Sequence, residues 1–463
     1  MAPNLLIESI LPHLGAILGL GLGVILIARL MREKRRPSNT FAWLLVIILA
    51  PYIGVPLFLL IGGRKIKKLT NDKRSLRLHT EDHTQDYIED SPFGLLGHGN
   101  KTRFLPDASD AYDVLIESIQ NAKESIDITT FILSHDAVGR RVVKELSRRA
   151  KEGVRVRLLL DAIGSFGKKT FYMLELEKAG GKIERFMPVF PIAFPGATNL
   201  RNHRKIAIFD KDTAIIGGRN IGREYMGPNP SKSRWTDFGV QIAGPAVSAL
   251  NTIFEEDWAF ASRKRGYKAV TQTAVKPVEG GRSTIEIMSS GPDTPDDPLY
   301  EKVLASIQDA ERSITIVTPY FIPDEVLQRS LSVKARTGRD VTIIVPQRSN
   351  HRITDLARRH FLEELQAAGV KVLAYQREMM HGKAMLIDQK LAMTGSANMD
   401  LRSLFVNFEV AAFFYSKPDI QEVSKWISDV SSRCVELQPR DLKRQRYLKG
   451  LVEDLSRLIA PLL

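Results

Sequence analysis

Two stretches of this chain repeat one pattern of residues: NHRKIAIFDKDTAIIGGRN at positions 202–220 and MHGKAMLIDQKLAMTGSAN at positions 380–398. Each stretch reads His-x-Lys-x4-Asp and continues through a glycine-rich turn to an asparagine. The members of the two copies are His203, Lys205, Asp210 and Asn220 in the first, and His381, Lys383, Asp388 and Asn398 in the second. A lone His-x-Lys pair is common in half-buried strands. Two copies with the same spacing from His to Asn indicate a functional motif that occurs twice.

The repetition extends beyond these motifs. The tripeptide SIQ at 118–120 precedes the apolar stretch SIDITTF at 125–131, and SIQ at 306–308 precedes SITIVT at 313–318. Helical and strand-like patterns alternate after both stretches, and such alternation is typical of α/β domains. The sequence therefore predicts an α/β protein with two pseudo-symmetric sheet-plus-helix halves that share a central cleft.

The composition of the chain restricts the ligands it can hold. The chain has 463 residues and a formal net charge of +13, which favours anionic ligands such as phosphorylated compounds, anionic lipids or nucleic acid. Cys434 is the single cysteine, so no intramolecular disulfide is possible. No Cys/His cluster has the spacing of a zinc site, and we expect neither a structural metal nor a cofactor.

Two apolar runs, at 9–28 and 41–61, stand near the amino terminus without a formal charge. Each is long enough to cross a bilayer, for which about 20 helical residues suffice. A cleaved signal peptide needs a positive charge before its apolar run, and no Lys or Arg precedes Arg29. We therefore expect membrane segments. Pro51 and Pro56 interrupt the second run, so it either crosses the membrane or re-enters on one side.

The first apolar run carries a face of small residues at helical spacing, namely Gly15, Gly19 and Gly23. Glycines at this spacing let two helices approach closely in lipid. The second apolar run or a second subunit is the expected partner, so the chain is a candidate for self-association.

The chemistry of the repeated motif follows from its residue types. In a strand, residues two apart point to one face, so His203 and Lys205 face the same side, as do His381 and Lys383. An unprotonated imidazole can attack phosphorus, and a second imidazole can protonate the leaving group. The two lysines would neutralise the charge that develops on the phosphate, and Asn220 would donate to it.

Two carboxylates are candidates for orienting the imidazoles, because each stands alone in a strand-like apolar stretch. Glu409 lies in FVNFEVAAFF and Asp237 in RWTDFGVQI. The acidic members of the motifs, Asp210 and Asp388, are candidate site residues by their place in the pattern. Because both end their strands, we interpret their own role as structural hydrogen bonding.

The pair of motifs resembles that of the phospholipase D superfamily, over residues 105–439. Within the superfamily, three stretches are similar to the membrane-anchored bacterial cardiolipin synthases. They are RPSNTFAWLLVIILAPYIGVPLFLLIGGRK at 36–65, TPYFIPDE at 318–325 and GSANMDLRSLFVNFEV at 395–410. With this resemblance, the expected domains are an anchor at 1–69, a linker at 70–101, a first half at 102–262, a linker at 263–283, a second half at 284–439 and a carboxy-terminal amphipathic helix at 440–463.

The resemblance implies an activity and a set of site residues. The enzyme would join two phosphatidylglycerol molecules into cardiolipin and release glycerol through a phosphatidyl-histidine intermediate, as a multi-pass protein of the bacterial inner membrane. The implied catalytic pair is His203 and His381, with His203 our expectation for the nucleophile. The implied phosphate ligands are Lys205, Asn220, Lys383 and Asn398, and the implied supports of the imidazoles are Glu409 and Asp237.

Three alternatives remain at this point. A related hydrolase would use water as the acceptor, and a related synthase would use another alcohol such as serine or ethanolamine. A phospholipase D-like nuclease is disfavoured, because no basic stripe interleaved with aromatic residues is present for a strand to follow. We therefore expect anionic membrane lipids, and not nucleic acid, as partners.

Overall fold

The computed structural model describes residues 21, 25–28, 37–63, 87–92, 94–165, 172–188, 198–262, 274–294 and 296–438. They belong to two compact units: residues 1–66 with 188–200, and residues 67–187 with 201–463. The predicted carboxy-terminal helix at 440–463 and the glycine face of Gly15, Gly19 and Gly23 lie outside the described residues. The two units are treated separately below.

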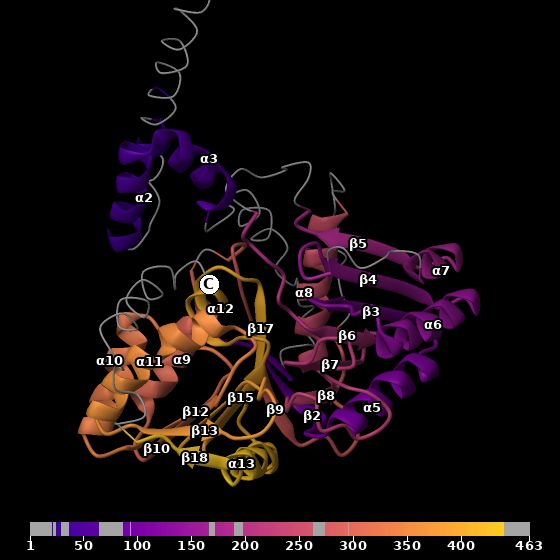
Figure 1. The fold of residues 1–463 in the computed structure, drawn as a ribbon. Coiled ribbons are helices and arrows are strands. Elements are labelled where there is room, and N and C mark those ends of the chain that lie inside the picture. Colours follow the sequence, from indigo (N-terminus) through magenta and orange to yellow (C-terminus); the bar gives the residue numbers. More distant parts are fainter. Residues whose placement is uncertain are drawn as a thin grey trace, which may run out of the picture. The chain divides into compact units, whose positions relative to one another are not determined.

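The larger unit is built on one 16-stranded sheet, in which the strand order of the first half is repeated in the second (Figure 1). The first half has the order β2-β8-β7-β6-β3-β4-β5, and the second has β9-β17-β15-β14-β10-β12-β13, followed by β18 at the edge. The first-half strands are β1 (Ile88–Asp90), which pairs with β2, β2 (Leu95–Leu105), β3 (Ser125–Thr130), β4 (Arg155–Asp161), β5 (Lys182–Phe186), β6 (Ile206–Phe209), β7 (Thr213–Gly217) and β8 (Gly239–Ala243). The second-half strands are β9 (Ser283–Ser290), β10 (Ser313–Val317), β12 (Asp340–Pro346), β13 (Lys371–Tyr375), β14 (Ala384–Ile387), β15 (Leu391–Gly395), β17 (Glu409–Phe414) and β18 (Cys434–Glu436).

The two halves join at the centre of the sheet. β2 pairs antiparallel with β9, with Leu95 opposite Ile287. Within each half, the central strand pairs parallel on one side and antiparallel on the other, as β3 does with β4 and β6. The predicted mixed α/β fold with a repeated domain is confirmed.

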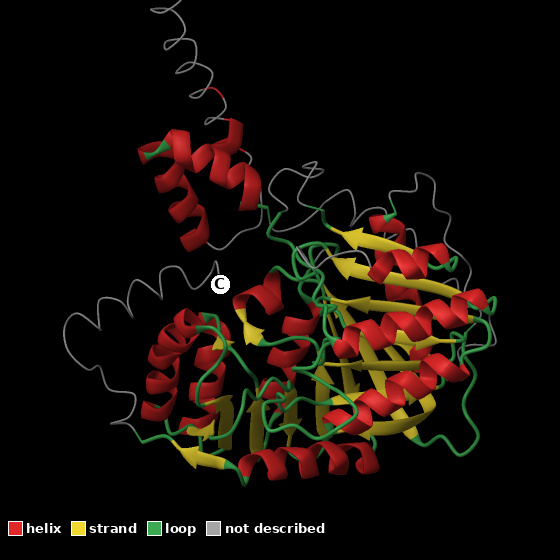
Figure 2. Ribbon diagram, turned by 45° about the vertical axis from the view of Figure 1, so that its right-hand side comes forward, coloured by secondary structure: helices red, strands yellow, loops and turns green. Residues whose placement is uncertain are grey.

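Helices cover both faces of the sheet (Figure 2), and Figure 1 places α8 on the face of the first half away from α5, α6 and α7. The first-half helices are α5 (Ala108–Asn121), α6 (Ala137–Lys151), α7 (Met173–Lys178) and α8 (Ala246–Ala261). The second-half helices are α9 (Pro298–Asp309), α10 (Glu325–Arg336), α11 (Arg352–Ala367), α12 (Leu401–Phe405) and α13 (Lys417–Ser431). Because both faces are covered, every residue of β3 and of β17 is buried.

The second half has an additional small element beside its motif. β11 (Phe321–Ile322) pairs parallel with β16 (Met399–Asp400), and α12 follows directly. Asp400 caps α12, because its side chain accepts a hydrogen bond from the backbone of Ser403. This element fixes the chain just beyond Asn398.

The smaller unit contains the second apolar run, which does not form one helix. α2 (Pro37–Leu49) and α3 (Pro51–Ile61) are separated by Ala50, whose backbone is not helical at φ −136° and ψ 63°. The two helices pack closely: a Cβ on Gly54 would lie 2.5 Å from the carbonyl oxygen of Val46. The run therefore turns back on itself at Ala50 and forms two short helices.

The outer surface of this helix pair is apolar. Exposed side chains on it include Phe41, Ile48, Leu49, Tyr52 and Ile53. In the part of the chain that the structure describes, no helix combines the length and apolar character that a bilayer span requires. The expectation of a multi-pass anchor is not supported by the described residues.

Candidate active site

The two motif histidines lie where the two halves exchange backbone hydrogen bonds. Asn202 forms an isolated parallel bridge with Phe408, and Thr236 forms one with Met380. The backbone N–H of His203 donates to the carbonyl oxygen of Phe408 at 2.9 Å, and that of His381 donates to Thr236 at 2.7 Å. Each histidine is therefore held against a segment of the opposite half.

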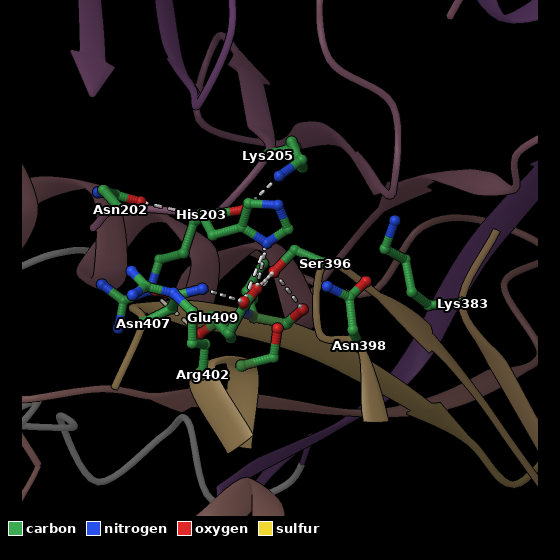
Figure 3. A network of polar contacts seen from close by, with 12 residues as sticks. Asn202, His203, Lys205, Lys383, Ser396, Asn398, Arg402, Asn407 and Glu409 are labelled. Atoms are coloured by element: carbon green, nitrogen blue, oxygen red, sulfur yellow. Dashed lines mark hydrogen bonds and ion pairs between the residues drawn. The ribbon is translucent and has the colours of Figure 1, made fainter. Parts of the chain in front are cut away.

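This exchange pairs each imidazole with a carboxylate of the other half. Nδ1 of His203 lies 2.9 and 3.0 Å from the two oxygens of Glu409, as Figure 3 shows. Nδ1 of His381 lies 2.7 Å from Oδ2 of Asp237. Both carboxylates are fully buried at 0% exposure, so no water competes for these contacts. The sequence identified both carboxylates but gave no indication of the crossed pairing.

The electrostatics of the site keep both imidazoles neutral at pH 7. Burial lowers the pKa of His203 to about 4, and the nearby Lys205 contributes in the same direction against the attraction of Glu409. Burial and the charge of Lys383 lower the pKa of His381 to about 3. A neutral imidazole whose Nδ1–H donates to a carboxylate has a free lone pair on Nε2. The lone pair on Nε2 of His203 is therefore available for attack, whereas Nζ of Lys383 lies 3.2 Å from Nε2 of His381.

Burial alone would raise the pKa of each carboxylate, but attraction from its partner imidazole and from the lysines outweighs burial. The pKa of Asp237 is therefore lowered, chiefly by His381 and Lys383, and that of Glu409 by His203 and Lys205. Both groups are thus ionised and can only accept, which places the proton of each imidazole on Nδ1.

The motif lysines lie beside their histidines. Nζ of Lys205 donates to the carbonyl oxygen of His203 at 2.7 Å, and Nζ of Lys383 donates to that of His381 at 2.5 Å. Burial lowers the pKa of Lys383 to about 8, and burial with repulsion from Lys383 lowers the pKa of Lys205. Lys383 also lowers the pKa of His203, and Lys205 that of His381. The two copies of the motif therefore contribute to one electrostatic site.

The motif asparagines are buried beside the same site. Oδ1 of Asn220 accepts from the backbone of Ile132 at 3.2 Å, which leaves its Nδ2 as the side of the amide available for donation. Nδ2 of Asn398 donates to Asp400 at 3.0 Å, while its Oδ1 has no hydrogen-bond partner among the described residues. Figure 3 shows Asn398 between His203 and Lys383.

The motif aspartates lie away from the imidazoles and serve the backbone. Asp210 has a positive φ of 49° and accepts from the backbone N–H groups of residues 123, 124 and 125. Asp388, with φ 52°, does the same for residues 311, 312 and 313. Both carboxylates lie at the starts of β3 and β10, whereas Phe131, just beyond the end of β3, contacts the ring of His203. These contacts fit the interpretation of both aspartates as structural groups, and their place among the candidate catalytic residues stays a prediction.

One difference between the two motifs follows from the lengths of the two carboxylates. Ser396 donates from Oγ to Glu409, and Gly218 takes the corresponding place in the first motif. A Cβ on Gly218 would overlap the carboxylate of Asp237. The shorter acid therefore requires glycine beside it, whereas the longer one accommodates a serine that donates to it. The sequence carried this signal as the change from GGRN to GSAN.

A cavity of about 440 Å³ opens on one side of the site, against His203. Its lining includes residues for which the repeated pattern gave no signal, because they are not shared by the two motifs. They are Phe131, Arg201, Tyr320, Asn350, Arg402 and Asn407. Within the described ranges, no group of three or more His, Cys, Asp or Glu side chains is placed to hold a metal ion.

A repeated α/β half with one His-x-Lys motif each, joined so that the motifs share a site, defines a phospholipase D-like phosphotransferase. A family model described as "Cardiolipin synthase, PLD-like domain" matches residues 115–258 and 303–430, and one described as "Phospholipase_D-nuclease N-terminal" matches residues 21–63. The chain belongs to the cardiolipin synthase family of phospholipase D-like proteins.

Curated relatives match over nearly the whole chain. "Cardiolipin synthase" of Geobacillus kaustophilus (strain HTA426) is 31% identical, over 93% of this chain and 90% of the relative. "Cardiolipin synthase 2" of Bacillus cereus is 34% identical, over 93% and 88%. Among solved structures, phosphatidylserine synthase of Haemophilus influenzae Rd KW20 has a TM-score of 0.60 at 16% identity, over 78% of this chain and 95% of that one. This last likeness shows the fold alone.

Proposed function

We propose that this enzyme transfers a phosphatidyl group from one phosphatidylglycerol to the hydroxyl of another, giving cardiolipin and glycerol. The observation that carries the proposal is the crossed pair of buried contacts, His203 with Glu409 and His381 with Asp237. These contacts direct two neutral imidazoles to one site that both motif lysines influence. Such a site suits a phosphodiester, which needs one nucleophile, one proton carrier and positive charge around its oxygens.

In the first half-reaction, Nε2 of His203 attacks the phosphorus of phosphatidylglycerol and the bond to the glycerol oxygen breaks. His381 supplies the proton to that oxygen, and glycerol leaves. The pKa of His381 is about 3 without substrate. A bound phosphate places a negative charge near the ring, and an opposite charge favours the protonated form. Substrate binding therefore favours the protonated form of His381, which is the acid that this step needs.

In the second half-reaction, the hydroxyl of a second phosphatidylglycerol gives its proton to His381 and attacks the same phosphorus. The bond from phosphorus to Nε2 of His203 breaks, cardiolipin is released and both imidazoles return to their starting states. Lys205, Lys383, Asn220 and Asn398 would hold the phosphate oxygens throughout.

The assignment of His203 as the nucleophile rests on the surroundings of the two rings. The side chain of His203 is 12% exposed and lines the cavity, whereas that of His381 is 6% exposed. Nζ of Lys383 lies 2.9 Å from Nδ1 of His381, and the rings of Tyr225 and Trp235 pack around it. His203 therefore has the freer path to an incoming lipid head group.

An activated substrate separates the two roles. A phosphatidyl ester of p-nitrophenol has a leaving group that needs no proton, so His381→Ala should release p-nitrophenol in a burst and retain a phosphatidyl adduct. Mass spectrometry should place that adduct on His203, and His203→Ala should show no burst. The reverse result would assign the nucleophile to His381.

The membrane location is proposed from the smaller unit. The exposed apolar side chains of α2 and α3 suit insertion into one face of a bacterial cell membrane. α2 has 13 residues, or about 20 Å of helix, which is shorter than a hydrocarbon core of about 30 Å. The hairpin would thus enter and leave on the same side. Association of two subunits through Gly15, Gly19 and Gly23 stays a prediction.

The proposed activity is tested with detergent-solubilised protein and phosphatidylglycerol. Cardiolipin and glycerol in equal amounts are the expected products. Phosphatidic acid alone would instead indicate a hydrolase, and a product formed only with serine or ethanolamine would indicate another acceptor. Activity confined to DNA or RNA would indicate a nuclease.

A further inference from the structure

The cavity beside His203 is larger than one phosphate requires. Its volume of about 440 Å³ is in the range of pockets that hold whole small ligands, which extends from about 300 to 1,000 Å³. Two arginines are among its lining residues, Arg201 and Arg402. Neither belongs to the repeated motif, and the two half-reactions described above assign them no task.

Arg201 has hydrogen-bonding capacity that the protein does not use. Its residue is 4% exposed, and its Nη1 donates to the carbonyl oxygen of Met187 at 3.0 Å. The same atom lies 3.5 Å from Asp161, whose oxygens accept from the backbone of residues 163, 164 and 202. Nε and Nη2 of Arg201 have no hydrogen-bond partner in the described part of the chain. Buried donors of this kind usually have an acceptor, which can be a water, an ion or a ligand.

The backbone directs Arg201 and His203 to the same face. The backbone of Phe408 donates to the carbonyl oxygen of Arg201 and accepts from the N–H of His203, so Asn202 is bridged between them. In extended backbone, residues two apart share a face and lie about 6.5 Å apart. Both side chains line the cavity. An anion on Arg201 would therefore lie next to the phosphorus on His203 without coinciding with it.

Arg402 brings a second positive charge from α12. Burial lowers its pKa, the attraction of Asp400 opposes this shift, and the charge of Arg201 adds to it, although a guanidinium stays protonated in proteins. Nη2 of Arg402 donates to Oδ1 of Asn407 at 3.5 Å. Asp400 lies nearby but accepts from the backbone of Ser403 and from Nδ2 of Asn398. In Figure 3 the side chains of Arg402 and Lys205 lie on opposite sides of the imidazole of His203. Arg402 and Lys205 therefore approach His203 from different sides.

The positions that correspond to these arginines in the other motif carry no cation. Met379 stands two residues before His381, where Arg201 stands before His203, and Glu224 stands four residues after Asn220, where Arg402 stands after Asn398. The two arginines therefore do not belong to the part of the site that both motifs share, which fits a second anion bound beside His203.

We propose that Arg201 and Arg402 form a second phosphate subsite, which binds the phosphodiester of the acceptor lipid while its free hydroxyl faces the phosphorus on His203. The inference rests on the proposed function and names the group by which the acceptor is chosen. A three-carbon glycerol bridge separates the two phosphates of the product, in keeping with neighbouring positions on one strand face. Arginine suits this task because its planar fork pairs with two phosphate oxygens at once. Water and glycerol lack the phosphate and gain nothing from the subsite.

The test compares two isotopically labelled soluble acceptors, sn-glycerol 3-phosphate and glycerol, with unlabelled phosphatidylglycerol as the donor. The label is needed because transfer to glycerol regenerates phosphatidylglycerol. The measured quantity is the ratio of transfer to the phosphorylated acceptor over transfer to glycerol. The wild type should prefer the phosphorylated acceptor. Arg402→Gln should lower the ratio about tenfold, the effect of losing one charged hydrogen bond. Arg402 is the better position to vary, because Arg201 also faces the buried Asp161.

Two further variants control the result. Arg402→Lys keeps the charge and should restore part of the preference. Arg336→Gln removes the same charge from an exposed position on α10 and should leave the ratio unchanged. A wild type without preference for the phosphorylated acceptor would overturn the proposal. So would an Arg402→Gln variant that loses both transfers equally, or one whose ratio equals that of the wild type.

Failure of the proposed function has a different signature. A wild type that converts phosphatidylglycerol only to phosphatidic acid would refute the synthase activity. In that case glycerol 3-phosphate should still inhibit hydrolysis by the wild type, and about tenfold less effectively in Arg402→Gln, if the anion subsite exists. Equal inhibition of both proteins would refute the subsite as well.

Discussion

The contact between His203 and Glu409 allows a sharp test by the single substitution Glu409→Gln. Glutamine keeps the shape of the side chain and removes its charge. In the wild type the two carboxylate oxygens lie 2.9 and 3.0 Å from Nδ1, and the side chain is completely buried. The carboxylate can only accept, so it fixes the proton on Nδ1 and leaves Nε2 free for attack. A glutamine can instead turn its NH₂ toward Nδ1, which moves the proton to Nε2 and blocks the nucleophile.

The expected loss of rate has two parts. A hydrogen bond to a charged group contributes about 1.5–3 kcal/mol, or about 10- to 150-fold in rate if it is needed only in the transition state. The wrong tautomer adds to this loss, and an amide in place of a carboxylate behind a catalytic histidine lowers kcat by about 10⁴ in the Ser-His-Asp enzymes. We therefore expect kcat to fall by about 10² to 10⁴, while KM for phosphatidylglycerol changes little.

The assay is the release of glycerol and the formation of cardiolipin in mixed micelles. Glu145→Gln is the matched control, because Glu145 is also buried at 5% exposure but lies on α6, where its partners are Arg141 and Arg148. Thermal unfolding should show both variants folded, and ¹⁵N NMR should report the tautomer of His203. A rate within threefold of the wild type in Glu409→Gln, or an equal loss in Glu145→Gln, would refute the orienting role.

Three further outcomes follow from the site. Gly218→Ser should lower kcat at least about tenfold, because its Cβ overlaps the Asp237 carboxylate, and the rate of the folded variant measures this. The value of kcat/KM should fall as the pH rises through about 8, because Lys383 loses its charge there. In a Lys383→Arg variant the fall should occur at higher pH. A fall at the same pH would exclude Lys383 as its source. Asp388→Ala should destabilise the fold by about 1–3 kcal/mol, because three backbone N–H groups lose their acceptor, while the specific activity of the folded fraction persists. Burial alone would raise the pKa of Asp388, but the backbone donors outweigh it and lower this pKa in the folded state. The contribution of Asp388 to the free energy of unfolding is therefore complete above the pKa of the unfolded state and is lost as the pH falls through the pKa of the folded state. Unfolding measured as a function of pH tests this.

The sequence predicted the repeated α/β halves because the same local pattern recurs in both. It also singled out Glu409 and Asp237, because an isolated acid in an apolar strand demands a partner. It gave no basis for the crossing of these contacts. The bridges of Asn202 with Phe408 and of Thr236 with Met380 join segments far apart in the chain, and nothing in the local periodicity of either segment encodes its partner.

The sequence left one further feature open and missed another, for different physical reasons. The run at 41–61 has the hydropathy of a span, but the backbone breaks at Ala50 and the packing of Gly54 on Val46 turns α3 against α2. Arg201 and Arg402 look like ordinary surface cations in the sequence. The burial of Arg201 depends on the bridge at Asn202, and the half-buried position of Arg402 depends on α12; only the folded chain brings both beside His203.

The crossed histidine–carboxylate contacts and the two arginines beside His203 together explain how a protein with two similar halves can assign different roles to two identical lipids. Each imidazole contacts a carboxylate of the opposite half, so neither half alone holds an oriented histidine. The pairing of β2 with β9 positions the two halves for both contacts. Two equivalent halves would leave the enzyme unable to distinguish donor from acceptor, since both substrates are the same lipid. Arg201 and Arg402 remove that equivalence on the flank of His203. The two motifs would then bind the phosphate that is transferred, and Arg201 and Arg402 would bind the phosphate of the acceptor lipid.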